Sequence, residues 1–542
     1  MRRILAGLAV AAATVAVAVP AHAEQQPVAP RATMLADGAP VAGGAHRPFE
    51  THHVSRRPAA ARLAAGETHT VTVVHVGFDG QPAPVHSTSL LGADLTEYDA
   101  LERTGTATVA VPAGRYVLSS VIMPADPADA RAALLVDPVL DVAGDVTVVV
   151  DARAARTSSI SVPAAGVVPV LASVGLTYST AAGTAEIGIS GDSLERIYTA
   201  QIGADTGVDG IVSSVSGVWS SADATTTFNL RYNRIGSLMS GYRHDVRRGE
   251  LTAVPTSFAA GNAPELTGNW YAVSRLPGQD EVHGAAVGLP VRLPSTVMRY
   301  FNNDGGVQWR TRMYELTPEC FGCSVTTGAW TSYRPGATVA EGWNRAVFSP
   351  SGGGVTRDGD TINVDLPMYS DGAGRTGNSG DAGTTVLQRD GVEVGREEWG
   401  GAGAFTVPDA RRGRYRLAVE SRRGAPYALS TSVAAAWEWT GDPALIDVRF
   451  APRLGADNSA PAGRDLAVPV TVLTPSPGPR AVTVDVSYDD GATWTRAPYA
   501  GGLAQLHHPA AAGFVSLRAN VRDVGGNTAA VTVIRAYRIS AA

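Results

Sequence analysis

The sequence contains no lysine and only two cysteines among its 542 residues. Its 44 basic residues are therefore all arginines, a bias that the codon usage of a GC-rich genome explains most simply. The formal net charge of −6 excludes a general electrostatic attraction to nucleic acid. Zinc-protease and EF-hand motifs are absent from the sequence as well. Beyond residue 23 no apolar run is long enough to cross a membrane, so we expect no membrane insertion.

The first 23 residues read MRRILAGLAVAAATVAVAVPAHA, with two arginines, an apolar run and a small-x-small site at Ala21-His22-Ala23. This layout is typical of a secretory signal peptide. We therefore expect cleavage after Ala23 and a secreted, extracellular protein. Residues 24–65 are rich in Ala, Pro, Gly and Arg without periodicity, which predicts a flexible leader.

The two cysteines, Cys320 and Cys323, stand in the sequence Cys-Phe-Gly-Cys. In an oxidising extracellular setting we expect them to form a tight disulfide across a turn. A structural zinc site needs four ligands, and only two thiols are present. The ring that the disulfide closes is small, so it would constrain a turn without stapling a domain.

The sixty glycines and thirty-four prolines, together with many Val, Thr and Ser, favour short strands joined by turns. Apolar and polar residues alternate with period 2 at residues 68–76, 106–111 and 146–151. A strand with one apolar face must meet a second sheet, so the sequence predicts an all-β protein of several β-sandwich domains in tandem. Short helices are expected only at 93–102 and 192–198. The expected boundaries are a β-sandwich at 66–153, a β-rich domain at 154–260, an aromatic-rich β-domain with the CxxC pair at 261–385, a sandwich portion at 386–455 and a last domain at 456–542.

Residues 487–494 read SYDDGATW and fit the Asp-box pattern S-x-D-x-G-x-T-W at each specified position. In such a box the Asp carboxylate accepts turn N–H bonds, the Gly permits a positive φ, and the Trp packs on a β-hairpin. A propeller would carry several boxes at regular spacing, and this sequence has one clear copy. We therefore expect a structural, non-catalytic hairpin built on Ser487, Asp489, Gly491, Thr493 and Trp494.

Several stretches resemble accessory domains of known families. DGQPAP at 79–84 and VPAGRY at 111–116 are similar to transthyretin-like or carboxypeptidase-regulatory-like domains, which implies that fold for the first sandwich. VVVDAR at 148–153, the SYDDGATW block and GFVSLRANVRDVGGNT at 513–528 resemble the C-terminal accessory region of secreted subtilisin-like serine peptidases of high-GC Gram-positive bacteria. The last domain looks immunoglobulin-like. The resemblance implies a non-catalytic string of sandwiches, without the peptidase domain, that binds an extracellular protein or a cell-wall or glycan partner.

The catalytic patterns in the sequence are incomplete. DTGVD at 205–209 looks like the aspartate motif of subtilisin-like peptidases, but His283-Gly284 lacks the usual following residues and Gly-Thr-Ser is absent. GDSL at 191–194 spells the nucleophile block of an esterase family without that family's later blocks. A helix N-cap is the plainer interpretation of Asp192 or Ser193. We therefore expect no catalytic residues, with a peptidase or esterase using a non-standard site as an alternative.

Four aspartates, Asp358, Asp360, Asp365 and Asp371, are close enough along the chain to share a Ca²⁺ ion, whose ligands are oxygens. Turn formation explains the same residues without an ion. No other cofactor is expected.

Tryptophan and tyrosine are concentrated in residues 300–343. Exposed on a sandwich face, Trp309, Trp330, Tyr333 and Trp343 could stack on sugar rings, which makes a carbohydrate-binding protein a further alternative. Burial in a sandwich core explains these residues too, because Trp and Tyr are common there.

Overall fold

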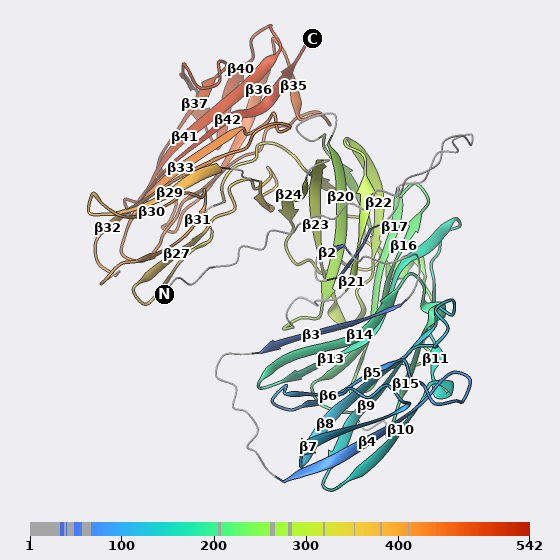
Figure 1. Cartoon of the computed structure of the whole chain (residues 1–542). Helices are drawn as coiled ribbons and strands as arrows, with labels where there is room; N and C mark the ends of the chain where they lie inside the picture. The colour runs from blue at the N-terminus through green and yellow to red at the C-terminus, as the bar shows by residue number, and fades with distance from the viewer. Residues whose placement is uncertain are drawn as a thin grey trace.

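The chain folds into two lobes made almost entirely of β-strands, as Figure 1 shows for a computed structural model. The expectation of an all-β protein built from β-sandwiches is confirmed. The expected signal peptide and much of the expected leader lie outside the residues that the structure describes. These residues are 33–36, 39–40, 48–56, 67–203, 207–260, 266–279, 285–317, 320–351, 353–379, 382–409 and 411–541.

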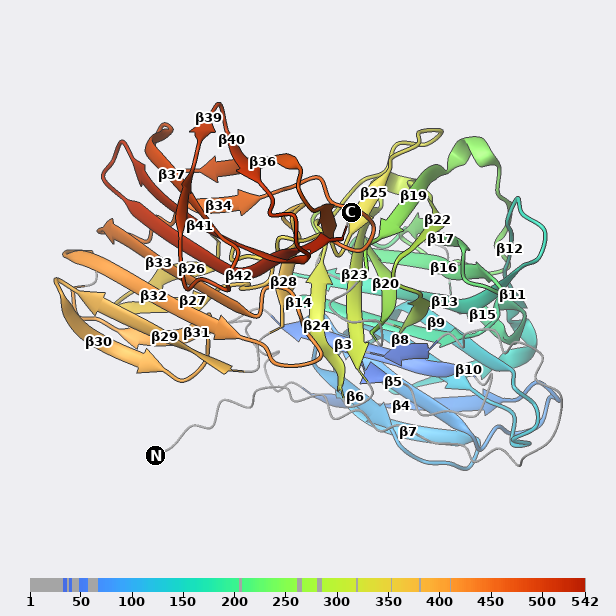
Figure 2. The same ribbon diagram turned by 90° about the horizontal axis from the view of Figure 1, so that it is seen from above.

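The first lobe is a stack of four sheets, seen from two directions in Figures 1 and 2. The outermost is three-stranded, in the order β10 (Val146–Asp151), β4 (Thr68–Val76), β7 (Thr106–Pro112). The second is six-stranded, in the order β11 (Arg156–Thr157), β15 (Ile197–Gln201), β9 (Ala132–Val142), β8 (Gly114–Ile122), β5 (His86–Gly92), β6 (Glu97–Ala100).

The third and fourth sheets complete the stack. The third is eight-stranded, in the order β25 (Glu341–Trp343), β19 (Thr252–Phe258), β22 (Ser295–Phe301), β17 (Thr226–Ile235), β16 (Ile211–Ser221), β13 (Val167–Thr180), β14 (Gly183–Gly191), β3 (Phe49–Arg56). The fourth is seven-stranded, in the order β2 (Ala39–Pro40), β1 (Thr33–Ala36), β21 (Ala285–Val291), β20 (Thr267–Arg275), β23 (Gln308–Thr317), β24 (Cys320–Thr327), β28 (Thr376–Asn378). β12 (Ser159–Ser161) and β18 (Arg243–Asp245) pair in parallel and form a separate two-stranded sheet.

The six-stranded sheet is buried on both faces. Neighbouring residues in a strand point to opposite faces, yet Leu90 and Leu91 are both buried, as are Val117 and Leu118. Leu90 and Leu118 belong to the core shared with the three-stranded sheet, and Leu91 and Val117 to the core shared with the eight-stranded sheet. A sheet covered on both sides needs near-continuous apolar strands, and the run Ala132–Val136 is buried throughout.

The other face of the eight-stranded sheet packs on the seven-stranded sheet. Phe258 and Trp343 come from the former, and Trp270, Leu289 and Met313 from the latter, and all five belong to one core cluster. The segments expected as separate domains at 66–153, 154–260 and 261–385 therefore belong to one stack of sheets, in which neighbouring sheets bury apolar faces against each other.

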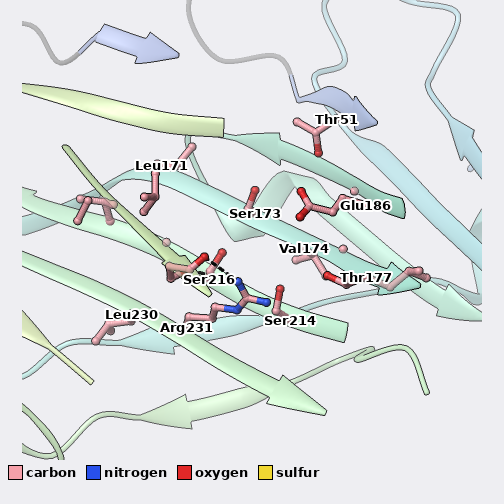
Figure 3. A pocket seen from close by; sticks show the side chains of 18 of the residues that line it. Thr51, Leu171, Ser173, Val174, Thr177, Glu186, Ser214, Ser216, Leu230 and Arg231 are labelled. Atoms are coloured by element: carbon pink, nitrogen blue, oxygen red, sulfur yellow. Dashed lines mark hydrogen bonds between the residues drawn. The ribbon is translucent and has the colours of Figure 1, made fainter. Parts of the chain in front are cut away.

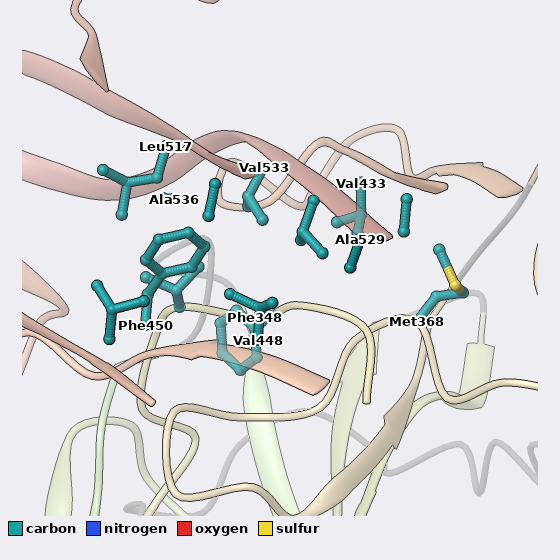
Figure 4. Packing of buried hydrophobic residues seen from close by; sticks show 14 of the residues in the cluster. Phe348, Met368, Val433, Val448, Phe450, Leu517, Ala529, Val533 and Ala536 are labelled. Carbon is teal, nitrogen blue, oxygen red and sulfur yellow. The ribbon is translucent and has the colours of Figure 1, made fainter. Parts of the chain in front are cut away.

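The second lobe is a sandwich around a single core, shown in Figure 4. Val433, Leu517 and Val533 lie on one side of this core, and Phe348 and Phe450 on the other. The large sheet follows the order β30 (Val392–Glu397), β29 (Ala382–Arg389), β32 (Arg414–Arg422), β33 (Ser432–Thr440), β42 (Thr528–Ser540), β41 (Gly513–Asp523), β37 (Pro479–Ser487), β38 (Thr495–Ala497), with β35 (Ser459–Pro461) also paired to β42.

Two smaller sheets cover the apolar face of this large sheet. They are β26 (Val355–Asp358), β27 (Thr361–Asp365), β31 (Ala402–Thr406), and β34 (Asp447–Phe450), β36 (Asp465–Leu473), β40 (Leu503–His507), β39 (Tyr499–Ala500). Because β33 pairs with β42, the segments expected at 386–455 and 456–542 contribute to one sheet and one core.

Helical structure in the described residues is limited to four single 3₁₀ turns: η1 (Ala152–Ala154), η2 (Leu194–Arg196), η3 (Arg248–Glu250) and η4 (Asp304–Gly306). The helix expected at 192–198 shortens to η2, because Ile197 already begins β15. The helix expected at 93–102 was wrong: β6 occupies Glu97–Ala100 and pairs with β5. Tyr98 there packs edge-on against Tyr116, at 5.8 Å between ring centroids, a contact that pairing with β5 provides.

Part of the expected flexible leader is ordered as a strand. β3 pairs antiparallel with β14, from Phe49↔Ser190 to Arg56↔Gly183. Strand pairing with a distant segment overrides the weak local signal of residues 49–56.

The two lobes are joined through a buried asparagine, Asn458, which is 0% exposed and has φ 56°. Its side-chain amide donates to the carbonyl oxygens of Ala260 and Asn344, each at 2.9 Å. Its side-chain oxygen accepts the backbone N–H of Ala346 at 2.9 Å. Asn is among the few residues that tolerate a left-handed backbone and can also make such bonds. Asn458 therefore connects residue 260 of the first lobe to the first residues of the second.

Replacing this asparagine should loosen the joint. For Asn458→Ala we expect a loss of about 4 kcal/mol, since three hydrogen bonds are worth roughly 1 kcal/mol each and a left-handed alanine adds about 1 more. Asn458→Gly keeps the backbone conformation at no strain and should lose only the hydrogen-bond part. Calorimetry measures the free energy of unfolding of both variants. If Asn458→Ala is as stable as the unaltered protein, the Asn458 hydrogen bonds do not stabilise the contact between the lobes.

Two histidines are buried and stacked in the first sandwich. The rings of His75 and His86 lie 3.6 Å apart at an interplanar angle of 8°, and their exposures are 0% and 2%. His75 Nε2 is 2.7 Å from Thr88 Oγ1. Burial, reinforced by the neighbouring His86, lowers the pKa of His75 to about 4, and burial together with the Arg103 charge lowers the pKa of His86.

These lowered pKa values make stability depend on pH with a definite sign. The unfolded chain binds protons near pH 6.5 while the folded histidines stay neutral, so stability should fall as the pH drops from about 6.5 towards 4. His86→Phe keeps an aromatic ring in the stack and should flatten this part of the profile of Tm against pH. His69→Gln, on the same strand as His75 but only half-buried, is the matched control and should leave the slope unchanged. If Tm falls equally with pH in His86→Phe and in the unaltered protein, the buried histidine pair is not the cause of the pH dependence.

Candidate functional site

A pocket of about 510 Å³ lies where the seven-stranded sheet meets the segment that leads into the second lobe. Its wall is formed by β23, the end of β24, the connection that follows β24, strand β25, and the residues around the start of β28. Pockets of this size are typical of small-ligand sites and often lie at junctions between domains. The lining side chains are Trp309, Arg310, Thr311, Thr327, Ala329, Thr331, Tyr333, Glu341, Trp343, Ala373, Arg375 and Thr376. We call it the junction pocket.

Glu341 is the hydrogen-bond acceptor at the centre of this pocket. Its carboxylate accepts from Arg299 Nη2 at 2.5 Å, from the Tyr333 hydroxyl at 2.7 Å and from Trp343 Nε1 at 2.8 Å. Burial alone would raise the pKa of Glu341, but the Arg299 charge and these hydrogen bonds outweigh it and lower the pKa. The carboxylate is therefore ionised and held in one orientation.

Arg299 supports the carboxylate from inside the core. It is 0% exposed and also donates to Thr256 Oγ1 at 2.7 Å and to Thr311 Oγ1 at 2.8 Å. Its guanidinium lies 5.0 Å from the centroid of the Trp270 ring. A buried charge is tolerated when it is paired and hydrogen-bonded, and Arg299 meets both conditions.

Arg375 forms another wall of the junction pocket. Its guanidinium stacks 4.1 Å from the centroid of Trp343 and donates to the Gly342 carbonyl oxygen at 2.5 Å. It also pairs with the buried carboxylate of Asp371 at 3.1 Å. The guanidinium is thus fixed in place over an aromatic ring.

The structure brings three of the four aromatic residues suggested for glycan binding to this pocket. Trp309, Tyr333 and Trp343 all line it, but they are only 5%, 5% and 2% exposed. They are core residues that contribute a wall, and they do not form a flat exposed platform. Trp330 is half-buried outside the lining, with Arg275 and Arg310 each 4.4 Å from its ring centroid.

Sequence reasoning missed the charged residues of the pocket. Arg310, Glu341 and Arg375 come from three separate segments, and no spacing in the sequence relates them. The one available signal was their position within or next to the aromatic-rich segment.

The four aspartates suggested as calcium ligands are spread over one hairpin and a later turn. Asp358 and Asp365 lie at strand ends of β26 and β27, Asp360 lies in the turn between these strands, and Asp371 pairs with Arg375. Within the described ranges, no group of three or more His, Cys, Asp or Glu is arranged to hold a metal ion.

The serine suggested by the GDSL pattern caps a turn. Ser193 Oγ accepts the backbone N–H of Glu195 at 3.2 Å at the start of η2. Asp205 and His283 of the peptidase-like patterns lie outside the described residues. Ser193 thus has the local capping role that its sequence position suggests.

Residues 487–494 form the turn of the β37–β38 hairpin. Asp489 Oδ1 accepts the Thr493 backbone N–H at 2.9 Å, and Asp489 Oδ2 accepts the Thr493 hydroxyl at 2.6 Å. Ser487 Oγ accepts the Gly491 N–H at 2.9 Å, and Gly491 has φ 89°. The two bonds from Thr493, followed by one that the Ser487 hydroxyl donates to Asp489 Oδ1 at 2.7 Å, lower the pKa of Asp489 to about 2. The indole of Trp494 lies under the Arg518 guanidinium, 4.6 Å from ring centroid to Cζ.

Cys320 and Cys323 are the first and fourth residues of strand β24, so the expected turn between them was wrong. The side chains of Cys320 and Cys323 are not among the described groups, so the disulfide stays a prediction.

Comparison with known proteins gives no family for this chain. No family model matches it, and no curated protein matches it. Among solved structures, the major pilin subunit of Bacillus cereus is similar at 9% identity and a TM-score of 0.12, with 51% of this chain and 99% of the pilin covered. Alpha-2-macroglobulin of E. coli gives 10% identity and a TM-score of 0.17, and this chain spans 40% of its length. Scores this low support no argument about function.

No helix in the described part of the chain is long and apolar enough to cross a membrane.

Neutralising Glu341 should destabilise the wall of the junction pocket. In Glu341→Gln the amide N–H₂ replaces one acceptor oxygen and leaves the buried Arg299 without its counter-charge, which costs about 3 kcal/mol by analogy with other broken buried pairs. Urea unfolding monitored by tryptophan fluorescence measures this. The control Glu398→Gln changes an exposed carboxylate and should be neutral within about 0.5 kcal/mol. Equal midpoints for the two variants would show that the Arg299–Glu341 pair contributes nothing.

Proposed function

We propose that this chain is a non-catalytic extracellular binding protein that takes a carbohydrate ligand in the junction pocket. The observation that carries the proposal is the pocket itself, about 510 Å³ in volume and lined by indole, phenol, guanidinium, carboxylate and hydroxyl groups. This volume lies in the range of pockets that enclose small ligands, such as one or two sugar rings.

The chemistry of the lining fits a sugar. Thr311 and Thr327 offer hydroxyl hydrogens to a ligand. Thr331 and Thr376 donate theirs to the carbonyl oxygens of Ala329 and Thr327 and offer acceptor lone pairs. Glu341 and Arg375 add a fixed acceptor and a fixed donor, and the aromatic wall suits the apolar face of a sugar ring. Because Glu341, Arg375 and the rings are already held by other side chains, little side-chain entropy is lost on binding.

The extracellular location rests on the N-terminal sequence, which has the layout of a secretory signal peptide. The resemblance to accessory regions of subtilisin-like peptidases agrees with a binding role at the cell surface. We propose cell-wall or other extracellular polysaccharides as the partner class.

Co-sedimentation with insoluble polysaccharides tests this function. Purified protein lacking residues 1–23 is mixed with chitin, cellulose or peptidoglycan, and we expect retention on at least one of them. Ala329→Trp should weaken retention at least tenfold, because a bulky side chain at this exposed lining position fills the pocket without removing a buried contact. Ala340→Trp adds the same side chain at an exposed position outside the lining and is the matched control. The proposal fails if no polysaccharide retains the unaltered protein, or if Ala329→Trp is retained as well as Ala340→Trp.

A further inference from the structure

A second cavity, of about 100 Å³, lies on the face of the eight-stranded sheet that meets the seven-stranded sheet (Figure 3). Strands β13, β14, β16 and β17 form its floor, and β20 covers part of it. It is distinct from the junction pocket, although Trp309 lines both. The volume is about three times that of a water molecule in the liquid, so it suits a ligand of a few non-hydrogen atoms.

A buried arginine, Arg231, reaches into this cavity from β17 (Figure 3). It is 2% exposed, and its Nε donates to Asn233 Oδ1 at 2.9 Å. Its Nη1 makes two long contacts with Ser274, 3.3 Å to the carbonyl oxygen and 3.4 Å to Oγ. Among the described residues Nη2 has no hydrogen-bond acceptor, so this nitrogen is available to a ligand.

The floor beside Arg231 is formed by hydroxyl groups. Ser214 and Ser216 stand two residues apart on β16 and so share a face. Neither hydroxyl makes a side-chain hydrogen bond within the described ranges. Both serines are partly exposed, which opens the cavity to solvent on this side. Gly175 and Gly188 also line the floor and add no side chain to it.

A single carboxylate, Glu186 on β14, lines the cavity from another strand (Figure 3). Its charge partly offsets the burial that lowers the pKa of Arg231 to about 10, so the guanidinium stays charged at neutral pH. Arg231 and Glu186 do not form an ion pair with each other in the described part of the molecule. A buried cation without a close counter-ion is costly, and an anionic ligand would relieve that cost.

We propose that this cavity binds a small hydroxycarboxylate, with its carboxylate on Arg231 and its hydroxyl on the Ser214–Ser216–Glu186 side. The remaining guanidinium nitrogen, Nη2, matches a carboxylate in charge and can donate charge-assisted hydrogen bonds to it. Glu186 accepts a hydrogen bond from a hydroxyl but repels a second negative charge, which disfavours a dianion. The small volume excludes an oligosaccharide, so this ligand differs in class from that of the junction pocket.

Titration calorimetry with L-lactate, propionate and glycerol tests the assignment. We expect saturable binding of lactate, binding of propionate about tenfold weaker because it lacks the hydroxyl, and no binding of glycerol because it lacks the carboxylate. Arg231→Met should abolish lactate binding. Glycerol binding as tightly as lactate, or no saturable lactate heat with the unaltered protein, overturns the proposal.

A second variant covers the case in which Arg231→Met does not fold. Ser216→Leu fills the cavity from its partly exposed side and leaves Arg231 and its partners in place. It should weaken lactate binding at least tenfold, while Ser332→Leu, at an exposed position that is not part of the lining, should not. Equal lactate affinity in both variants also overturns the proposal. Ala329→Trp should keep full lactate binding, so this test does not depend on the junction pocket.

Discussion

Burial of both faces of the inner sheets is the constraint on which the first lobe depends. A strand in an antiparallel sheet can leave one face in water, but strands of the six-stranded sheet bury adjacent residues such as Leu90 and Leu91 on opposite sides. Polar residues in these strands must then find partners inside the stack. Two pairs of hydroxyl groups form hydrogen bonds across neighbouring strands. Thr88 Oγ1 is 2.7 Å from Ser120 Oγ, and Ser89 Oγ is 3.2 Å from Ser119 Oγ.

The same constraint explains where the candidate sites lie. Charged residues between apolar layers need partners. Arg299 has hydrogen-bond partners on all three nitrogens, while one nitrogen of Arg231 has none in the part of the chain that the structure describes. Around these residues the sheets cannot close on apolar side chains alone, so space is left beside them. The junction pocket and the Arg231 cavity are both next to such a charge. Charged residues buried between the sheets thus lie beside the cavities in which a ligand can be recognised.

Local patterns in the sequence predicted the strands well where neighbouring residues define them. The strands expected at 68–76 and 146–151 match β4 and β10 residue for residue, because each alternates between apolar and polar positions. Residues 93–102 and 49–56 were misjudged because pairing with distant strands decides their structure. The aromatic part of the junction pocket was visible in the sequence as a cluster. Its charged part was not, since Glu341 and Arg375 meet only through folding.

The sequence by itself determined that the chain is β-structured, where many of its turns fall and which segment is rich in aromatic residues, because these depend on neighbours along the chain. The tertiary structure decided how the sheets stack, that residues 386–455 and 456–542 share one core, and that Trp343 is a core wall and not an exposed platform. These outcomes depend on which sheets bury their apolar faces against each other. Side chains far apart along the chain become neighbours only when the faces of different sheets are buried against each other, and local periodicity does not encode that choice.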